Sequence, residues 1–339
     1  MELKNIAILG PGGNVGTAII TELLKDGPRF TITGITQPTS SYTPPPTITH
    51  RTVDYTSFAS LQAAFQDQDA VVNCITGGAT HYEPSKLIID AAVAAGVKFF
   101  FANEFVGEIT REAFRRLPEA FVGGKCRIRE YLEGLAREGK MAWTSLNGGP
   151  FFDMWLMKGP AGFDIPNRHA RIYGSGNHPL HWTPLPIMGL AAGNMLRNPQ
   201  LVLNRPILLD PISPCSTVTQ NTLLHTLEKL LDTTFTISHV DVNKVHRNAL
   251  IVLEEWKAGG EQEEGKAQMG KAMKGLGLCN QFYEGDDEDH AEDLNRNVQN
   301  ELVGVKTMEL EDAVRDALER FGKDCQVVQG MYNVEACEL

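Results

Sequence analysis

The 339-residue sequence lacks the features of several large protein classes. Its formal net charge of −11 argues against nucleic acid or an anionic membrane as the main partner, since both are polyanions. No apolar stretch approaches the roughly 20 residues that span a bilayer, and the amino terminus has no signal-peptide pattern. Six cysteines lie scattered, without a Cys-x-x-Cys pair or metal-type spacing to histidine. We therefore expect a cytoplasmic protein, monomer or homodimer, with reduced thiols, no metal site and a small-molecule substrate.

Apolar runs and helical patterns alternate through the first half of the chain. This alternation predicts βαβ units and an α/β fold, with a doubly wound parallel sheet of the Rossmann type over residues 1–155. Residues 156–339 show looser patterns and are expected to form a smaller α+β substrate-binding region, interleaved with the carboxyl edge of the sheet. The expected strands are 6–9, 30–35, one near Val53, 69–77, 98–105 and 141–151, and the expected helices are 17–25, 58–65, 85–97 and 123–139.

A glycine-rich loop, "GPGGNVG", follows the first expected strand and precedes a helix. Gly10 allows a sharp turn, Gly13 lets backbone approach a pyrophosphate, and Gly16 lets the helix sit close to the sheet. Amide groups at the helix N-terminus would then face the phosphates. No Gly-Lys-Ser/Thr follows, which excludes a P-loop. The loop therefore predicts a dinucleotide site that includes Gly10, Pro11, Gly13, Asn14, Val15 and Gly16.

The end of the second expected strand carries Thr36 and Gln37 but no acidic residue. Sites that prefer NAD usually place Asp or Glu there to hold the ribose hydroxyls, so its absence favours NADP(H) over NAD(H). No arginine stands there to clamp a 2′-phosphate, and Arg51 is a possible distant helper. Because ligands bind at the carboxyl ends of parallel strands, the further expected cofactor residues are Thr76, Gly77, Asn103, Asn147 and Gly148.

Three segments together resemble a known family: the Gly-x-x-Gly-x-x-Gly loop, "AAVAAGVKFFFANEF" and "KCRIREYLE". They are similar to the NmrA-like group and, within it, to the isoflavone-reductase-like branch of atypical short-chain dehydrogenases. The resemblance extends over roughly residues 1–330. In that branch "AAGVKRF" is usually followed by "SEFG"; here Asn103 replaces the serine, and Gln37 stands where the family usually has arginine.

The resemblance implies an NADPH-dependent reductase in which one lysine does most of the chemistry, and by position this lysine is Lys125. The residues alone leave Lys125 open between a surface lysine at a helix start and a site residue. Its ammonium could bind the nicotinamide ribose or stabilise a developing oxyanion. Glu104 would be a general acid or base if burial raises its pKa, or else a structural carboxylate that accepts backbone amides.

The segment "YEPSK" matches the Tyr-x-x-x-Lys dyad of ordinary short-chain dehydrogenases. It follows the fourth expected strand instead of lying on the helix after the fifth. Since Pro84 suits the first turn of a helix, we expect Tyr82 to precede that helix and not to share a face with Lys86. The dyad is therefore not expected to be functional.

Aromatic side chains gather in the sequence around the expected carboxyl edge of the sheet. Each alone could belong to the core, but together they favour an aromatic or heterocyclic substrate over a sugar or phosphate. His178 and His181 could add a polar handle. The expected substrate residues are Phe105, Phe151, Phe152, Trp155, His178 and Trp182.

The leading hypothesis is an NADPH-dependent reductase of secondary metabolism that acts on an aromatic or alkaloid-like molecule, assisted by Lys125. One alternative is a non-redox enzyme that uses bound NADP⁺ as a structural cofactor, while Glu104 and Lys125 handle protons in a condensation or ring closure of the Pictet–Spengler type. Another is an NmrA-like regulator that senses the nicotinamide redox state and binds a protein partner.

Overall fold

The computed structural model describes residues 1–76, 81–110, 114, 117, 124–213, 218–259, 265–282 and 298–333. The chain divides into two compact units. The first comprises Met1–Gly149, Leu185–Leu209 and Val298–Lys306, and the second comprises Pro150–Pro184, Asp210–Asn297 and Thr307–Leu339. The expected division was a single boundary after residue 155, whereas the chain passes back into the first unit twice.

The first unit is built on a seven-stranded sheet in the order β3-β2-β1-β4-β5-β6-β9. Every neighbouring pair in it is parallel, which confirms the predicted doubly wound Rossmann-type sheet. The central strands are short apolar runs buried on both faces, as parallel strands require. In chain order the seven strands are β1 (Asn5–Leu9), β2 (Thr31–Thr36), β3 (Thr49–Thr52), β4 (Ala70–Asn73), β5 (Phe99–Ala102), β6 (Ala142–Asn147) and β9 (Arg205–Leu208).

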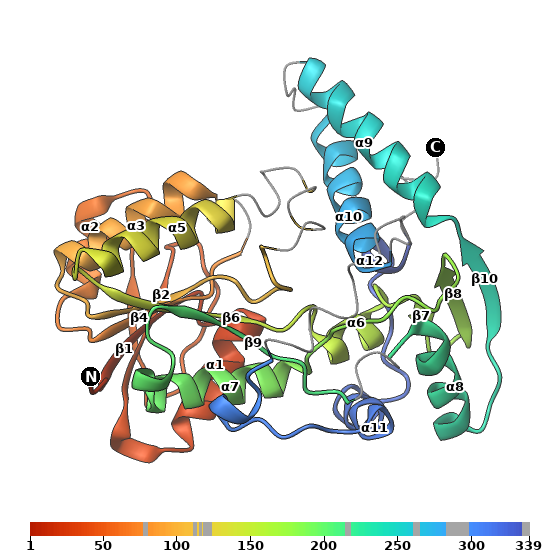
Figure 1. Ribbon diagram of the computed structural model, residues 1–339, viewed down its shortest axis with the longest axis horizontal. Coiled ribbons are helices and arrows are strands. Elements are labelled where there is room, and N and C mark those ends of the chain that lie inside the picture. The colour runs from red at the N-terminus through yellow and green to blue at the C-terminus, as the bar shows by residue number, and fades with distance from the viewer. Residues whose placement is uncertain are drawn as a thin grey trace. The chain divides into compact units, whose positions relative to one another are not determined.

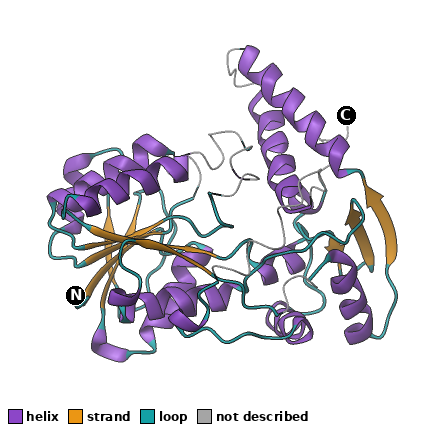
Figure 2. Ribbon diagram, in the orientation of Figure 1, coloured by secondary structure: helices purple, strands orange, loops and turns teal. Residues whose placement is uncertain are grey.

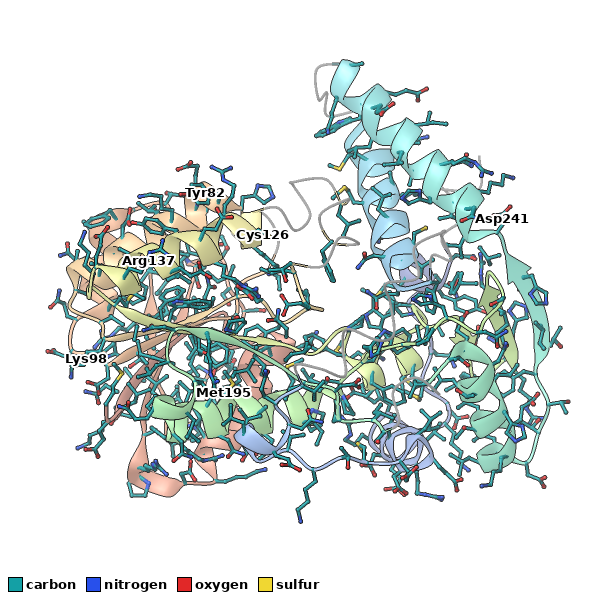
Figure 3. All side chains as sticks on the ribbon, viewed as in Figure 1. Tyr82, Lys98, Cys126, Arg137, Met195 and Asp241 are labelled. Atoms are coloured by element: carbon teal, nitrogen blue, oxygen red, sulfur yellow. The ribbon has the colours of Figure 1, made fainter. Side chains whose placement is uncertain are left out.

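Helices cover both faces of this sheet (Figure 1). On one face lie α2 (Phe58–Phe65), α3 (Tyr82–Ala94) and α5 (Gly124–Arg137), and on the other lie α1 (Asn14–Leu24) and α7 (Leu185–Arg197). Figure 3 shows the two faces through Tyr82 and Arg137 on one side and Met195 on the other. The short 3₁₀ helices of this unit are η1 (Gly27–Arg29), η4 (Pro199–Leu201) and η8 (Glu301–Val303).

Helix α7 and strand β9 were not expected from the sequence. The α7 segment begins with a proline in its first turn and holds two glycines, which lowers its apparent helix propensity. Those glycines serve the packing of α7 against α1 instead. A Cβ on Gly189 would lie 2.8 Å from the carbonyl oxygen of Ala18, and one on Gly193 would lie 2.7 Å from Cγ of Glu22. Strand β9 carries Pro206, which suits its place at the edge of the sheet.

The second unit contains a three-stranded sheet in the order β10-β8-β7 (Figure 2). Strand β10 (Thr236–Val240) is parallel to β8 (His169–Tyr173), and β7 (Phe163–Asp164) is antiparallel to β8. This mixed sheet and its helices confirm the predicted smaller α+β region. The helices are α6 (Phe152–Lys158), α8 (Gln220–Leu231), α9 (Val242–Ala258), α10 (Lys266–Phe282), α11 (Leu310–Phe321) and α12 (Gln329–Tyr332).

Helix α10 was also not predicted from the sequence, because its segment is rich in glycine and lysine. Its length is supported by packing along α9, and Ala272, Leu276 and Phe282 are buried in it. Within the described part of the chain, no helix combines the length and apolarity that crossing a bilayer requires.

The close approach of α7 and α1 makes Gly189 a sensitive position. We expect Gly189→Ala to destabilise the protein by about 1–3 kcal/mol, because the new Cβ meets backbone atoms that cannot rotate away. Gly134→Ala on α5 is the matched control, since its Cβ would meet nothing closer than 3.9 Å and alanine favours the helix. Urea unfolding of both variants provides the measurement. A Gly189→Ala variant as stable as the wild type would contradict the packing argument.

Candidate active site

The glycine loop turns the chain from β1 into α1 with two close backbone approaches. Gly10 has a φ of +73°, and a Cβ there would lie 2.8 Å from the carbonyl oxygen of Cys74. A Cβ on Gly16 would lie only 2.3 Å from the carbonyl oxygen of Gly10, so the first turn of α1 sits directly on the loop. Gly13 is the N-cap of α1 and provides no side-chain cap, which leaves the helix N-terminus suited to an anion.

A cavity of about 460 Å³ opens beside this loop at the ends of β1, β2 and β4. Of the predicted cofactor residues, Gly10, Pro11, Gly13, Thr36, Gln37 and Thr76 line it. Asn14, Val15 and Gly16 form the start of α1, with Val15 and Gly16 buried. Gly77 lies outside the described residues. The full lining is Gly10, Pro11, Gly12, Gly13, Thr36, Gln37, Thr39, Ser40, Ser41, Tyr42, Tyr55, Cys74, Ile75 and Thr76.

This lining contains no charged side chain. Thr36 and Gln37 occupy the end of β2, where Rossmann folds read the adenosine ribose. Arg51, considered above as a distant helper, donates a hydrogen bond of 2.8 Å to the carbonyl oxygen of Ala64 in α2. The geometry therefore fits a dinucleotide held by backbone amides and neutral side chains.

Lys125 lies in the first turn of α5 and points to the end of β5. Its Nζ donates to the backbone oxygen of Asn103 and, at 3.3 Å, to Oδ1 of the same residue. The side-chain Nδ2 of Asn103 in turn donates to the backbone oxygen of Ile75, after β4. Desolvation lowers the pKa of the Lys125 ammonium to about 8, while the negative charge of Glu104 opposes this by raising it. The half-buried lysine therefore holds its proton less tightly than a lysine in water.

Glu104 is 1% exposed and forms an ion pair with Arg129. Both of its carboxylate oxygens accept hydrogen bonds from the guanidinium, one of them at 3.0 Å from Nε. Arg129 also donates to Glu108 at 3.1 Å, so two carboxylates share one cation. A carboxylate held on both oxygens by arginine has the geometry of a structural anchor.

Asn147, at the end of β6, is fully buried and joined to the same cluster. Its Oδ1 lies 3.3 Å from a guanidinium nitrogen of Arg129, and its Nδ2 donates to the backbone oxygens of Glu104 and Gly107. The amide of Gly148 donates to the backbone oxygen of Val106 at 2.9 Å. Both residues therefore brace the loop that follows β5.

The expectation that Tyr82 precedes its helix is wrong. Helix α3 begins at Tyr82, so Lys86 lies four residues on and shares its face. Both side chains nevertheless interact with residues outside the predicted site. The Arg127 guanidinium carbon lies 3.9 Å from the centre of the Tyr82 ring, and Nζ of Lys86 lies 2.6 Å from Oδ2 of Asp90.

The predicted substrate residues divide between the two units. Phe105 belongs to the first, where it is 7% exposed and stacks on Phe101 with ring centres 5.5 Å apart. The others belong to the second unit, where Trp155 and Trp182 lie 5.2 Å apart. Trp182 is 1% exposed and Phe152 fully buried, while Phe151, Trp155 and His178 are half-buried.

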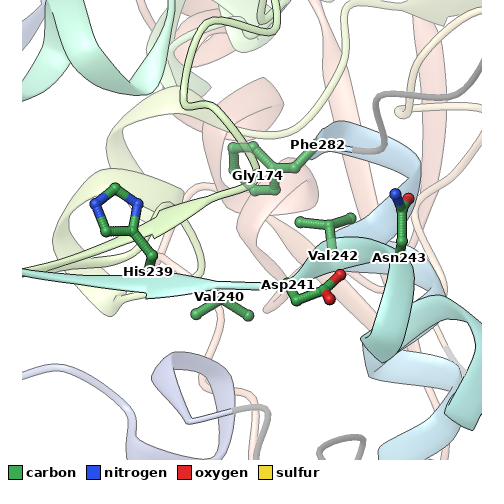
Figure 4. A pocket seen from close by; sticks show the side chains of 7 residues that line it. All are labelled: Gly174, His239, Val240, Asp241, Val242, Asn243 and Phe282. Carbon is green, nitrogen blue, oxygen red and sulfur yellow. The ribbon is translucent and has the colours of Figure 1, made fainter.

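His181 is paired with Asp210 in the second unit, with 3.1 Å between Nδ1 and Oδ2. Its Nε2 is buried and has no hydrogen-bond partner in the part of the chain that the structure describes. A histidine oriented by a carboxylate in this way presents Nε2 in a fixed direction. A further cavity of about 370 Å³ in this unit lies between β10 and α10 (Figure 4). It contains none of the predicted substrate residues, and its Asp241 caps α9 by accepting from the amide of Lys244.

The comparisons with known proteins agree with this geometry. Residues 10–154 match the family model described as NAD(P)H-binding. Oxidoreductase aprR of Aspergillus flavus is 33% identical over 253 residues, which cover 74% of this chain and 81% of that protein. The chain belongs to a family of NAD(P)H-binding oxidoreductases.

Solved structures extend the similarity over the whole fold. AtPrR2 with NADP⁺ and (+)pinoresinol superposes with a TM-score of 0.65 at 18% identity, over 94% of this chain and 99% of that chain. A crystal structure of isoflavone reductase gives a TM-score of 0.59 at 21% identity, over 93% and 95%. The predicted family, the fold class and the NAD(P)(H) cofactor are confirmed.

Sequence reasoning missed Arg129 and Glu108, which complete the charged cluster of this oxidoreductase. A signal was present, because Arg129 follows Lys125 by four residues on a helix and must share its face. It also missed Tyr42, because the proline-rich segment after β2 predicted only an extended loop.

We expect the two members of the buried ion pair to differ in how much their replacement destabilises the protein. Arg129→Met should destabilise the protein by about 3–5 kcal/mol, because it leaves the buried carboxylate of Glu104 without its cation. Glu104→Gln should cost less, since Arg129 keeps Glu108 as a counter-charge. Arg137→Met is the matched control on the same helix: its contact with Glu133 is 4.0 Å long and exposed, so we expect no measurable loss. Denaturant unfolding measures all three, and an Arg129→Met variant of wild-type stability would refute the assignment.

Proposed function

We propose that this chain is an NADPH-dependent reductase of an aromatic or alkaloid-like small molecule in secondary metabolism, with Lys125 as its catalytic residue. The observation that carries this proposal is the position of Lys125, whose ammonium is desolvated and held at the end of β5. The family membership supplies the class of reaction, and the substrate class and the cofactor preference are our inference.

NADPH would supply the hydride when bound. The loop residues Gly10 to Gly16 would hold the pyrophosphate through backbone amides at the start of α1. The uncharged end of β2 supports NADPH over NADH, because no carboxylate is present there to repel a 2′-phosphate. AtPrR2, which shares the fold, was solved with bound NADP⁺.

The hydrogen bonds of Lys125 indicate what it does. An ammonium group has three N–H donors, and two acceptor atoms of Asn103 engage two of them. The third donor is left for a substrate oxygen or a ribose hydroxyl. When negative charge develops on a substrate oxygen, an ammonium in a desolvated position stabilises it more than it would in water. A pKa of about 8 also allows Lys125 to give its proton to that oxygen near neutral pH.

We assign Glu104 a structural role instead of the acid–base role considered from the sequence. Its two oxygens are held by Arg129, and a general base needs an oxygen within reach of the substrate proton. The ion pair fixes the residue that follows Asn103, and it thereby orients the acceptor atoms that hold Lys125.

An aromatic substrate is supported by the second unit, where Trp155, Trp182 and Phe282 form one cluster. The indole nitrogen of Trp182 donates to Gln281 at 3.0 Å, which fixes the ring.

Removal of the lysine tests the proposed catalytic role. We expect Lys125→Ala to lower kcat by about 10²- to 10⁴-fold, because the proton donor is lost. Its affinity for NADPH, followed by fluorescence titration, should change much less. Lys86→Ala is the control, since that lysine is paired with Asp90. The assay follows NADPH absorbance with a panel of aromatic ketones, quinones and benzylic ethers. Full turnover by Lys125→Ala would disprove the role.

The same assay separates the other two functions. Consumption of a substrate without loss of NADPH would indicate the non-redox enzyme. Absence of any turnover, together with a protein partner whose binding differs between NADP⁺ and NADPH, would indicate the regulator.

The lowered pKa of Lys125 predicts a pH dependence. The protonated form is the active one, so kcat should fall as the pH rises through about 8. Lys125→Arg should retain some activity and lose this inflection, because a guanidinium stays charged over that range. The lysine can also be followed without substrate, by NMR titration of reductively ¹³C-methylated protein, with Lys125→Ala to assign the signal. A signal that titrates near the usual lysine value of about 10.4 would contradict the prediction.

A further inference from the structure

We propose that Tyr42 and His50 read the 2′-substituent of the cofactor's adenosine ribose and give this chain its preference for the 2′-phosphate of NADPH. The inference rests on the proposed NADPH dependence and names the residues that produce it. They take the place of the arginine that is missing at Gln37.

His50 is joined directly to the residue at which the fold reads the ribose. Strand β3 runs parallel to β2 and places His50 beside Gly34. From there its Nε2 lies 2.8 Å from Oγ1 of Thr36, the last residue of β2. The ring is exposed and therefore accessible to a ligand. An imidazole N–H at the end of β2 can donate a hydrogen bond to an anion.

Tyr42 covers the same place from the loop that follows β2. Its ring lies so close to the glycine loop that a Cβ on Gly12 would be 2.8 Å from Cδ2, and a Cβ on Gly34 would be 3.4 Å from Cε1. The rings of Tyr42 and His50 are 5.7 Å apart at an angle of 76°. The Tyr42 hydroxyl is buried and, among the described residues, has no hydrogen-bond partner. Tyr42 is one of the residues that line the predicted dinucleotide cavity, and its hydroxyl is a donor whose acceptor a bound ligand could supply.

The chemistry of these groups matches a phosphate better than a ribose hydroxyl. A 2′-phosphate offers only acceptor oxygens, which a phenol O–H and an imidazole N–H can both satisfy as donors. A free 2′-hydroxyl is usually bound by a carboxylate, and the cavity lining contains none. The neighbouring cation Arg51 is engaged with Ala64 of α2.

Calorimetric titration of the full chain with NADP⁺ and with NAD⁺ tests this assignment. The readout is the ratio of the two Kd values, because a merely structural role would weaken both cofactors alike. We expect His50→Gln and Tyr42→Phe each to weaken NADP⁺ about 10-fold, as loss of a charge-assisted hydrogen bond implies, and to leave NAD⁺ within about twofold. His50→Arg should keep the wild-type preference for NADP⁺ over NAD⁺ or increase it.

Arg51→Gln is the matched control, since it removes a cation from the adjacent position of β3 and should leave the ratio unchanged. The assignment is overturned if His50→Gln and Tyr42→Phe keep the wild-type ratio, or if Arg51→Gln lowers it. A change in only one of the two variants overturns the role of the other residue. A wild-type protein that binds NAD⁺ as tightly as NADP⁺ would contradict the NADPH dependence itself, which distinguishes the two failures.

Discussion

The ion pair between Glu104 and Arg129 is the interaction on which the rest of the candidate site depends. It joins the end of β5 to the second turn of α5, and Asn147 adds the end of β6 to the same cluster. Removing these charges from water costs hydration free energy, and the ion pair offsets that cost only when its hydrogen-bond geometry is good. Because both partners are fixed, Asn103 and Lys125 are fixed beside them. The proposed chemistry of the lysine would therefore depend on an ion pair that need not touch the substrate.

Much of the first unit could be predicted because its signals are local. Strands β1, β4 and β5 are short apolar runs, and the glycine loop has a spacing typical of a strand–turn–helix connection. Helix α7 and strand β9 could not be predicted in this way. Gly189 lowers local helix propensity, yet it allows α7 to pack closely on α1, and that advantage exists only when both helices are present.

The candidate site likewise contains residues that local sequence signals indicate and residues that only the tertiary structure reveals. Lys125 was found through the family motif, and its neighbour Arg129 is implied by helical spacing. The partners of Glu104 depend on how β5, β6 and α5 pack together, and this packing could not be predicted from the sequence. Tyr42 is a similar case, because nothing in a proline-rich loop indicates that its ring returns to cover Gly12.

The repeated passage of the chain between its two units has a consequence for synthesis. Strand β6 pairs with β9 through Thr144 and Arg205, so β6 remains an unpaired edge strand until the residues near 209 have left the ribosome. An open edge can pair with other strands, and it must stay protected while the intervening segment emerges. The last piece of the first unit, Val298–Lys306, arrives later still. The two units are thus obliged to mature together, and a fragment cut after residue 155 would expose a sheet edge that the intact protein never presents.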